Sequence, residues 1–335
     1  RMTQDGMARW PHIFSQFRLG TLDLPNRTVV APMTRISADA DGVATEQMAA
    51  HYADFARGGF ALIITEGTYT DTAESQGYRD QPGIVTPEQI AGWRRVVEAV
   101  HAADGRIVLQ LMHAGALVQE NRYTDDTIAP SAILPVGDMA ARYYGDGPVQ
   151  FLTPETNTRA DEYGGSLENR LRFHREIMVA VVRGLAGRGI AGMRISQSRT
   201  NDHNYKWQGG VEDARTIFAA LAADGVDYIH VSTHQGLVEE FGSGRTLAGL
   251  AREFSGVPVI GCGKLEDPLS AEQLLEAEEA DLFAIARGAI GDPHWPAKLA
   301  VGETPVPFDP GMISPFATLD ATADWRAANG ISFAA

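Results

Sequence analysis

Short runs of consecutive apolar residues alternate along the chain with longer stretches in which apolar residues recur every three or four positions. The short runs predict β-strands, and because most are apolar throughout, they predict strands covered on both faces. The runs span residues 28–31, 61–65, 107–112, 192–196, 226–232, 257–261 and 281–286. Strands that alternate with helical stretches are typical of a parallel sheet whose connections are helices.

Helix starts are marked by capping residues. Thr86 and Gln89 flank a proline and predict a helix that opens with a capping box. Ser270 and Gln273 predict the same device before a later helix. Residues 168–185 have the apolar spacing of an amphipathic helix.

The spacing of the strands tests for a (β/α)8 barrel, in which a unit recurs about every 30 residues. The interval from Ile107 to Gly192 is long enough for about two units, yet it contains one clear helix. A polar loop over residues 119–147 and a short apolar run over 149–152 occupy the rest. That run is flanked by prolines, which disfavour a central strand.

We therefore expect an α/β fold, a (β/α)8 TIM barrel that lacks or does not show strand 4 and its preceding helix. Residues 1–335 would form a single domain, with residues 308–335 as a C-terminal tail. A seven-stranded barrel has two unpaired edges. Either the run 149–152 substitutes for the strand, or the chain is altered or incomplete at this point.

Composition narrows the classes of function. The 335 residues are 44% hydrophobic and 21% charged, with a formal net charge of −15 and a pI of about 5.0. This charge disfavours nucleic acid and anionic membranes as partners. Cys262 is the single cysteine, so no internal disulfide is expected, and no residues have the spacing of a metal site. With no apolar run of 18 residues, we expect a soluble, cytoplasmic protein.

Candidate chemistry lies at the carboxyl ends of the predicted strands, where barrel active sites form. Pro32, Met33 and Thr34 follow the first strand and place a hydroxyl there; a plain proline turn is the alternative. Gln110 ends the third strand and offers a donor and an acceptor, which suits the edge of a heteroaromatic ring. A buried amide bonded to its neighbours is equally compatible with Gln110.

Three further residues indicate an anionic ligand. Arg194 lies within an apolar strand, where a permanent cation is costly unless it meets an anion; an ion pair with a neighbouring strand is the alternative. Gly263 and Arg287 follow the last two strands, where backbone N–H groups and a guanidinium form the usual phosphate site of a barrel. Structural turns are the alternative for these two positions.

The motifs as a set resemble the Old Yellow Enzyme family of NADH:flavin oxidoreductases. The segment 161–170, Asp-Glu-Tyr-Gly-Gly-Ser-Leu-Glu-Asn-Arg, is the most specific, and Ser166 within it suits a helix cap. The other matching segments, which cover most of the chain, are residues 31–35, 66–68, 110–113, 129–131, 157–160, 194–196 and 286–288.

The resemblance implies FMN as cofactor and NAD(P)H as reductant, and it implies roles for individual residues. Thr34 and Arg194 would tune the flavin as catalytic residues, and Met112, where the family often has Trp, would shape the substrate pocket. The cofactor-binding residues would be Pro32, Met33 and Thr34 beside the ring, Gly67 and Gln110 at its polar edge, Arg194 near N1 and O2, and Gly263 and Arg287 at the phosphate.

The resemblance also implies a cycle in which NAD(P)H gives hydride to the flavin and an electron-poor alkene then takes it. The family polarises the alkene's carbonyl with a His-x-x-His or His-x-x-Asn pair on the fourth strand, followed by a proton-donating Tyr. These residues are not found in this sequence. Residues up to Gln150 resemble the family's sequence before its fourth βα unit, and residues from Phe151 resemble its sequence after the fourth strand.

Three functions remain open on this basis. The first is an ene-reductase whose fourth unit is not in the sequence or is supplied in another way. The second is a flavin-binding protein or NAD(P)H oxidase without efficient alkene reduction. The third is a barrel without flavin that binds a phosphorylated metabolite. The tail, with Phe316, Trp325 and Phe333, either packs on a second subunit of a homo-oligomer or folds back on its own barrel.

Overall fold

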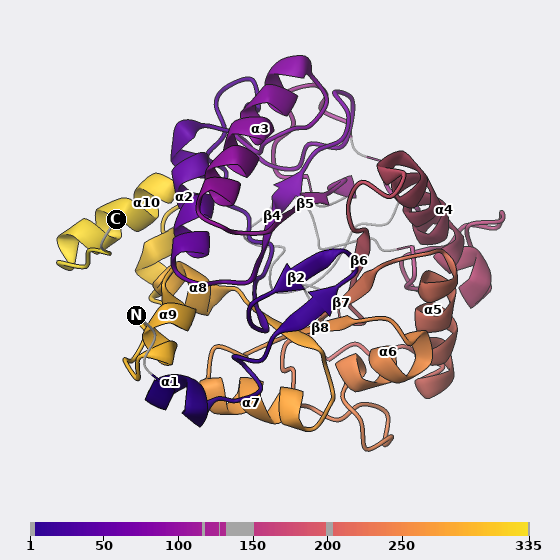
Figure 1. Cartoon of the computed structure of the whole chain (residues 1–335). Coiled ribbons are helices and arrows are strands. Elements are labelled where there is room, and N and C mark those ends of the chain that lie inside the picture. The colour runs from indigo at the N-terminus through magenta and orange to yellow at the C-terminus, as the bar shows by residue number, and fades with distance from the viewer. Residues whose placement is uncertain (1–3, 116–117, 127, 132–150, 199–203, 334–335) are drawn as a thin grey trace.

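The computed structural model describes residues 4–115, 118–126, 128–131, 151–198 and 204–333. All seven predicted strands are present, and they form one parallel sheet in the order β5-β4-β3-β9-β8-β7-β6. The first barrel strand pairs with both the second and the last, so the sheet curls toward closure (Figure 1). The strands are β3 (Thr28–Val30), β4 (Leu62–Thr68), β5 (Ile107–Leu111), β6 (Gly192–Ile195), β7 (Tyr228–Ser232), β8 (Val259–Cys262) and β9 (Leu282–Ile285).

The sheet is open between β5 and β6, which are its two edges. Within the described ranges no strand lies between them. The short apolar run at 149–152 does not replace it in the part that can be seen, because Phe151 and Leu152 form a bend, while residues 149 and 150 lie outside the described residues. Among the described residues, the expected α/β barrel therefore has seven strands and an opening where a strand of the eight-stranded fold would lie.

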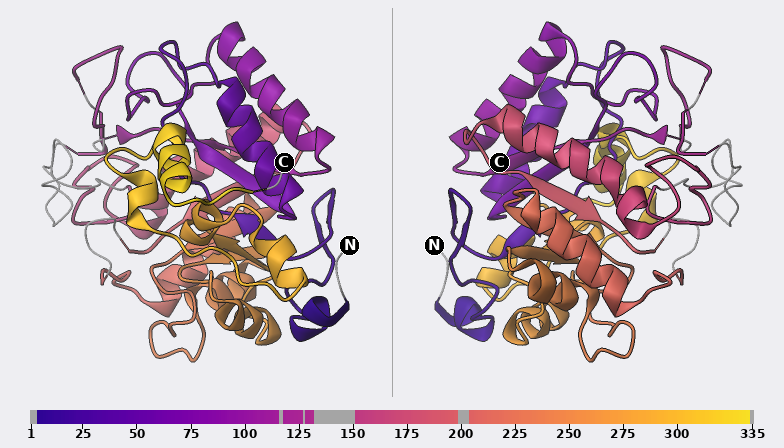
Figure 2. Two further views of the ribbon diagram at one scale, coloured as in Figure 1. Left: turned by 90° about the vertical axis from the view of Figure 1, so that its left-hand side faces the viewer. Right: turned by 90° about the vertical axis from the view of Figure 1, so that its right-hand side faces the viewer.

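Helices cover the outside of the strands (Figure 2). Their apolar faces and the outward side chains of the strands form the larger hydrophobic core, which includes Ile63, Phe218 and Phe283. The helices are α1 (Gln4–Arg9), α2 (Glu46–Arg57), α3 (Pro87–Ala102), α4 (Leu167–Leu185), α5 (Val211–Ala223), α6 (Leu247–Ser255), α7 (Pro268–Glu276), α8 (Arg287–Gly291), α9 (Trp295–Ala300) and α10 (Leu319–Ala328), with a 3-10 turn at Pro310–Ile313.

A short hairpin closes the amino-terminal end of the barrel. Its strands are β1 (Phe17–Leu19) and β2 (Leu22–Leu24), which pair antiparallel. Leu19 and Leu24 are buried in the inner core of the barrel with side chains from the starts of the strands. The hairpin does not cover the opposite end of the barrel, where the carboxyl ends of the strands lie.

The capping residues explain where the helices begin. Thr86 and Gln89 form the predicted capping box of α3, and the hydroxyl of Ser166 accepts the N–H of Asn169 at the start of α4. The prediction for α7 was wrong. Asp267 is its N-cap, and its carboxylate accepts both the N–H and the hydroxyl of Ser270. The helix begins three residues before the predicted cap Ser270, because Pro268 suits the first helical position.

The C-terminal tail folds back on its own barrel. The Phe333 ring lies 5.5 Å from the His294 ring and close to Lys298 and Arg326. Phe316 is the exception, with 68% of its surface exposed. Across the described ranges, no helix has the length and hydropathy needed to cross a bilayer.

Candidate active site

The carboxyl ends of the strands gather most of the residues predicted for the site. Pro32, Met33 and Thr34 follow β3 and are half-buried. Gly67 near the end of β4 is paired in register with Gln110 near the end of β5. The Gln110 N–H donates to the Thr65 hydroxyl at 3.0 Å, so its backbone is held against β4.

Gly67 and Met112 lie in direct contact. A Cβ on Gly67 would lie 2.5 Å from the Met112 sulfur and 3.0 Å from its Cβ, so a larger residue would displace that side chain. The Gly67 carbonyl accepts a hydrogen bond from the Gln81 amide at 2.8 Å. The absence of a side chain at residue 67 thus makes room for the Met112 side chain, which packs directly against this position.

Arg194 points toward the barrel interior and lines the same cavity as Gln110. One guanidinium N–H donates to the Ser232 hydroxyl at 2.9 Å. The expectation that Arg194 is a buried charge was wrong: its side chain is exposed. It is exposed because β6 is an edge of the sheet and no neighbouring strand covers it.

Cys262, at the end of β8, lies beside Arg194. Burial raises the pKa of this thiol above its usual value, although the hydrogen bond from Arg194 acts in the opposite direction. A neutral thiol and a guanidinium therefore share the interior end of the site.

Gly263 has a conformation that requires glycine. Its φ is +122°, and a Cβ there would lie 2.4 Å from the carbonyl oxygen of Thr233. Its own carbonyl accepts the N–H of Gly236 at 2.8 Å. The loops after β7 and β8 consequently approach each other closely at this point.

Arg287 is exposed and its guanidinium lies over the Phe308 ring, 5.8 Å from the centroid. It lines a cavity of about 710 Å³ together with Glu266 and Gly288. Gly263 does not line that cavity. Of the two residues predicted to hold a phosphate, the structure therefore places each at the carboxyl edge but does not bring them to one hollow.

A buried network that the sequence did not predict lies behind the Thr34 loop. Glu66 is fully buried, and one carboxylate oxygen accepts the N–H groups of Arg35 and Ile36 at 3.0 and 3.1 Å. The other accepts the hydroxyl of Tyr52 at 3.1 Å. Burial raises the pKa of Glu66 to about 7, although these hydrogen bonds act in the opposite direction. A glutamate within an apolar strand was the available signal.

Arg35 extends this network to the C-terminal helix. Its guanidinium donates to the carbonyls of Ala317 and Thr318 and to the hydroxyl of Thr322. Burial lowers the pKa of Arg35 to about 10. The network therefore fixes the backbone that follows Thr34 between β4 and α10.

His230 on β7 is a second buried polar residue that sequence reasoning missed. It is 1% exposed, and its Nε2 atom has no hydrogen-bond partner in the structure. Burial, with the nearby Arg194 charge, lowers the pKa of His230 well below its usual value. A lone histidine in the apolar run of β7 was its signal.

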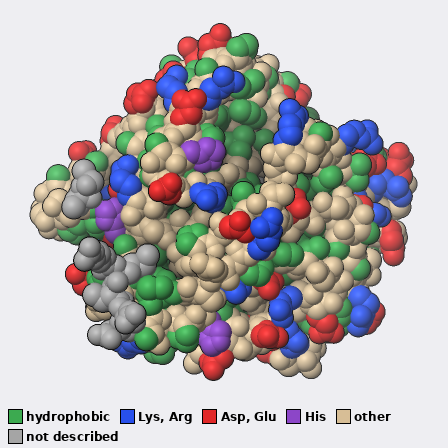
Figure 3. All heavy atoms as spheres, in the orientation of Figure 1, with side chains coloured by type: hydrophobic (Ala, Val, Ile, Leu, Met, Phe, Trp, Pro, Cys, Tyr) green, Lys and Arg blue, Asp and Glu red, His purple; other side chains and the backbone are tan. Residues whose placement is uncertain are grey.

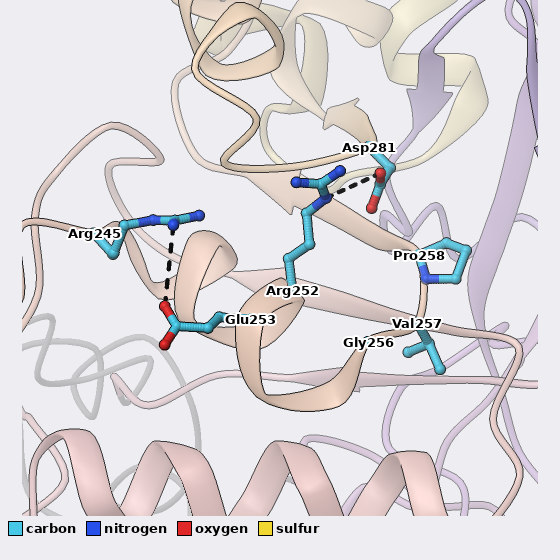
Figure 4. A pocket seen from close by; sticks show the side chains of 7 residues that line it. All are labelled: Arg245, Arg252, Glu253, Gly256, Val257, Pro258 and Asp281. Atoms are coloured by element: carbon cyan, nitrogen blue, oxygen red, sulfur yellow. Dashed lines mark hydrogen bonds and ion pairs between the residues drawn. The ribbon is translucent and has the colours of Figure 1, made fainter.

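A hollow beside the start of β8 is structural. Both of its arginines are paired. Figure 4 shows Arg252 with Asp281, at 3.2 Å, and Arg245 with Glu253, at 4.0 Å. Arg245 also pairs with Glu279 at 2.6 Å. Asp281 also accepts the N–H of Val259. This hollow at the amino end of β8 has its charges satisfied and is set apart from the candidate site.

Comparison with known proteins agrees with the motifs and the fold. The model of the NADH:flavin oxidoreductase / NADH oxidase family matches residues 12–143 and 147–304. An NADH oxidase from Thermoanaerobacter brockii is 29% identical over 344 residues, which include 88% of this chain and 52% of that protein. An NADPH dehydrogenase from Halalkalibacterium halodurans is 29% identical, covering 86% of this chain and 94% of that protein. The chain thus spans about half the length of the first relative and nearly all of the second.

Two solved structures are similar over most of their length. Morphinone reductase has a TM-score of 0.73 and 28% identity, covering 89% of this chain and 91% of that one. The old yellow enzyme homologue from Zymomonas mobilis has a TM-score of 0.75 and 25% identity, covering 89% and 94%. With the family model matched over most of the chain, the resemblance noted in the motifs is confirmed. The chain belongs to the NADH:flavin oxidoreductase / NADH oxidase family, with the α/β barrel of the Old Yellow Enzyme homologues.

Proposed function

We propose that the chain is an FMN-dependent oxidoreductase of the ene-reductase type, which passes hydride from NAD(P)H through the flavin to an electron-poor alkene. The observation that carries the proposal is the meeting of Gly67, Gln110 and Arg194 at one mouth of the barrel. Family membership supports FMN over a phosphorylated metabolite bound without flavin.

The residues present fit a flavin nucleotide. A Cβ on Gly67 would clash with Met112 and a Cβ on Gly263 would clash with the Thr233 carbonyl, so glycine at these two positions keeps both turns compact beside the mouth. Gln110 would meet the alternating N–H and C=O groups of the ring edge, and Pro32, Met33 and Thr34 would border the ring. Gly263 and Arg287, which lie at the same carboxyl edge although they do not line one hollow, would hold the phosphate, as backbone donors and a guanidinium do in other barrels.

FMN, when bound, supplies the acceptor and donor of hydride. Arg194 would stabilise the negative charge that accumulates at N1 and O2 of the ring, and its bond to Ser232 holds the guanidinium in place for this. Thr34 would hydrogen-bond the ring at O4, and the Glu66 carboxylate fixes the backbone directly after it. Met112 would border the substrate.

An NAD(P)H oxidase without efficient alkene reduction is the second candidate. It is favoured by one observation: the opening between β5 and β6 lies where the family's fourth strand would carry the residues that polarise an alkene's carbonyl. In that case cofactor reduction is retained and oxygen or another acceptor takes the electrons.

Two measurements test the proposal. The purified protein, saturated with FMN and freed of excess, should retain flavin absorbance, and anaerobic NADH or NADPH should bleach it. Turnover of cyclohexenone or maleimide then supports the ene-reductase, whereas bleaching with oxygen consumption and no turnover supports the oxidase. A colourless protein after FMN saturation would exclude both flavin functions.

We further propose that residues 1–335 act as one FMN-binding domain with 308–335 as its tail. The tail's contacts with α9 support this, through Phe333 and Lys298. The exposed Phe316 is a candidate contact of a homo-oligomer. One unpaired cysteine suits a reducing, cytoplasmic setting.

A further inference from the structure

Buried polar side chains surround the end of β4, and they have no role in the site described so far. The face of the molecule shown in Figure 3 has acidic and basic side chains interspersed with apolar ones, without a large patch of one charge. Inside, by contrast, Thr65, Thr68 and Gln81 are each no more than 1% exposed. Buried polar groups nearly always form hydrogen bonds, so the partners of these three residues show what they hold in place.

The strand β4 departs from regular pairing directly before Gly67. Its register with β5 shifts between Ile64 and Gly67. There the Gln110 N–H donates to the Thr65 hydroxyl, which is a side-chain group. Irregularities of this kind occur beside active sites, where they redirect the backbone. Gly67 has no Cβ to restrict its backbone, so its conformation needs support from its surroundings.

Side chains support both peptide groups that flank Gly67. The Glu66 carbonyl, in the peptide before Gly67, accepts the hydroxyls of Thr65 at 3.0 Å and Thr68 at 3.3 Å. The Gly67 carbonyl, in the peptide after it, accepts the Gln81 amide at 2.8 Å. A peptide group is planar and trans, so a fixed carbonyl also fixes the N–H on its opposite side. The N–H groups of Gly67 and Thr68 are therefore each held in one direction.

Gln81 is itself held by the loop that follows β4. Its Oε1 atom accepts the Gly77 N–H at 2.8 Å. Gly77 is closely packed, because a Cβ there would lie 2.4 Å from the Cβ of Ala114 in the loop after β5. Turning the Gln81 amide over would place its oxygen against the Gly67 carbonyl and its NH2 group against the Gly77 N–H. The donor end of Gln81 is consequently directed at Gly67.

A second glutamine of the same loop is equally buried but does not bond to β4. Gln76 is 1% exposed. Its Nε2 atom donates to the Tyr78 carbonyl at 3.1 Å, and its Oε1 atom accepts the Arg122 N–H at 2.9 Å. Its side chain thus joins loop to loop, whereas Gln81 joins the loop to the Gly67 carbonyl. Gln76 is therefore a matched control for Gln81.

We propose that Gln81 is a positioning residue for the flavin, which fixes the peptide between Gly67 and Thr68 in the orientation that meets the polar edge of the ring. The inference rests on the proposed function, in which Gly67 and Gln110 border that edge. Gln81 acts through the Gly67 carbonyl and is assigned no contact with the ring. A freed peptide has to be ordered again when the ring binds, and this cost weakens binding.

The first test compares Gln81→Met with Gln76→Met, since each variant loses two buried hydrogen bonds of one glutamine. FMN affinity, measured by quenching of flavin fluorescence, should fall about tenfold or more in Gln81→Met and stay within about twofold in Gln76→Met. Urea unfolding without FMN should show a similar loss of stability in both. Equal changes of FMN affinity in the two variants, or an unchanged affinity in Gln81→Met, would overturn the proposal.

Gln81→Glu separates the two bonds of the amide. It keeps an acceptor for Gly77, but it can donate to the Gly67 carbonyl only while the carboxyl is protonated. Burial raises the pKa of such a carboxyl. The ratio of variant to wild-type FMN affinity should therefore fall about tenfold or more between about pH 5 and about pH 8. Glu66, with a pKa of about 7, is common to both proteins. A ratio that does not vary with pH would contradict the role given to the donor.

Amide hydrogen exchange in the protein without FMN tests the peptide itself. Exchange at Thr68 should be faster in Gln81→Met and unchanged in Gln76→Met, while Gln110, bonded to the Thr65 hydroxyl, should not change in either. This readout separates the two levels of the proposal. A wild type that binds no FMN would end the proposed function. A wild type that binds FMN, with Gln81→Met unchanged in both affinity and exchange, would reject the positioning role alone.

Discussion

Tyr52 and Glu66 are joined by two hydrogen bonds in opposite directions. The Tyr52 hydroxyl donates to the Glu66 carboxylate at 3.1 Å and accepts the N–H of Glu66 at 3.0 Å. Both residues are buried, so neither has water as an alternative partner. A helix outside the barrel is thereby tied to the strand that carries Gly67.

Removing the Tyr52 hydroxyl should destabilise the protein. Tyr52→Phe keeps the ring but leaves a buried carboxylate oxygen and an N–H unpaired, which costs about 1–3 kcal/mol. Tyr163→Phe is the control, since its hydroxyl bonds to Glu176 at the surface and should change stability by less than about 0.5 kcal/mol. Urea unfolding measures both. Equal effects of the two would contradict the importance given to burial.

The raised pKa of Glu66, about 7 in the folded protein against 4.5 for a free glutamate, predicts a pH dependence. The folded state holds the proton more tightly, so this group's contribution to stability is full below pH 4.5 and is lost as the pH rises toward 7. The slope reaches at most about 1.4 kcal/mol per pH unit.

The comparison of wild type with Glu66→Gln isolates this contribution. The free energy of unfolding of the wild type, minus that of the variant, should decrease from pH 5 to pH 7 and then level off. His174, whose pKa burial lowers to about 4, acts in the opposite direction in this range, but it is common to both proteins. A difference that does not vary with pH would show that Glu66 stays ionised.

Gly263→Ala should lower both stability and FMN affinity. The left-handed conformation costs a residue with a Cβ about 1–2 kcal/mol, and the Cβ would press on the Thr233 carbonyl. We expect FMN affinity to fall at least about tenfold, measured by quenching of flavin fluorescence. Gly184→Ala in α4, where nothing lies within 4 Å of a new Cβ, should leave FMN affinity unchanged.

Arg194→Leu should lower the midpoint potential of bound FMN. Loss of a cation near N1 and O2 removes stabilisation of the negative charge there, and about 1.4–2.8 kcal/mol corresponds to about 30–60 mV for two electrons. Potentiometric titration with reference dyes measures this. Arg188→Leu, at the far end of the same cavity, is the control, and an equal shift in both variants would argue against a specific role for Arg194.

Most of the strands could be predicted from sequence because they are covered on both faces, whereas β5 and β6 at the edges are only partly buried. In runs such as 61–65 the apolar residues are consecutive, so they show no helical spacing. Only the ends of the strands differ from the prediction: β4 continues to Thr68 through an irregularity in register between Ile64 and Gly67. The cap of α7 was misassigned because Asp267 and Ser270 are both good caps, and the proline between them decided in favour of Asp267.

The site was predictable only as far as strand ends determine it. Gln110 and Arg194 share a cavity because parallel strands end on one side. The exposure of Arg194 depends on whether another strand covers β6, and the local sequence of β6 carries no information about this neighbour. The partners of Glu66 come from α2 and from the loop after β3, so its hydrogen bonds could be seen only once these segments were placed together.

The contacts of Arg35 join the last described helix to the loop that follows the first strand of the barrel. The Arg35 guanidinium donates hydrogen bonds to the carbonyls of Ala317 and Thr318. The backbone N–H of Arg35 donates to the Glu66 carboxylate next to the mouth of the barrel. The final helix is thus mechanically coupled to the first loop of the site. A change that displaces this helix should therefore also release the backbone that follows Thr34.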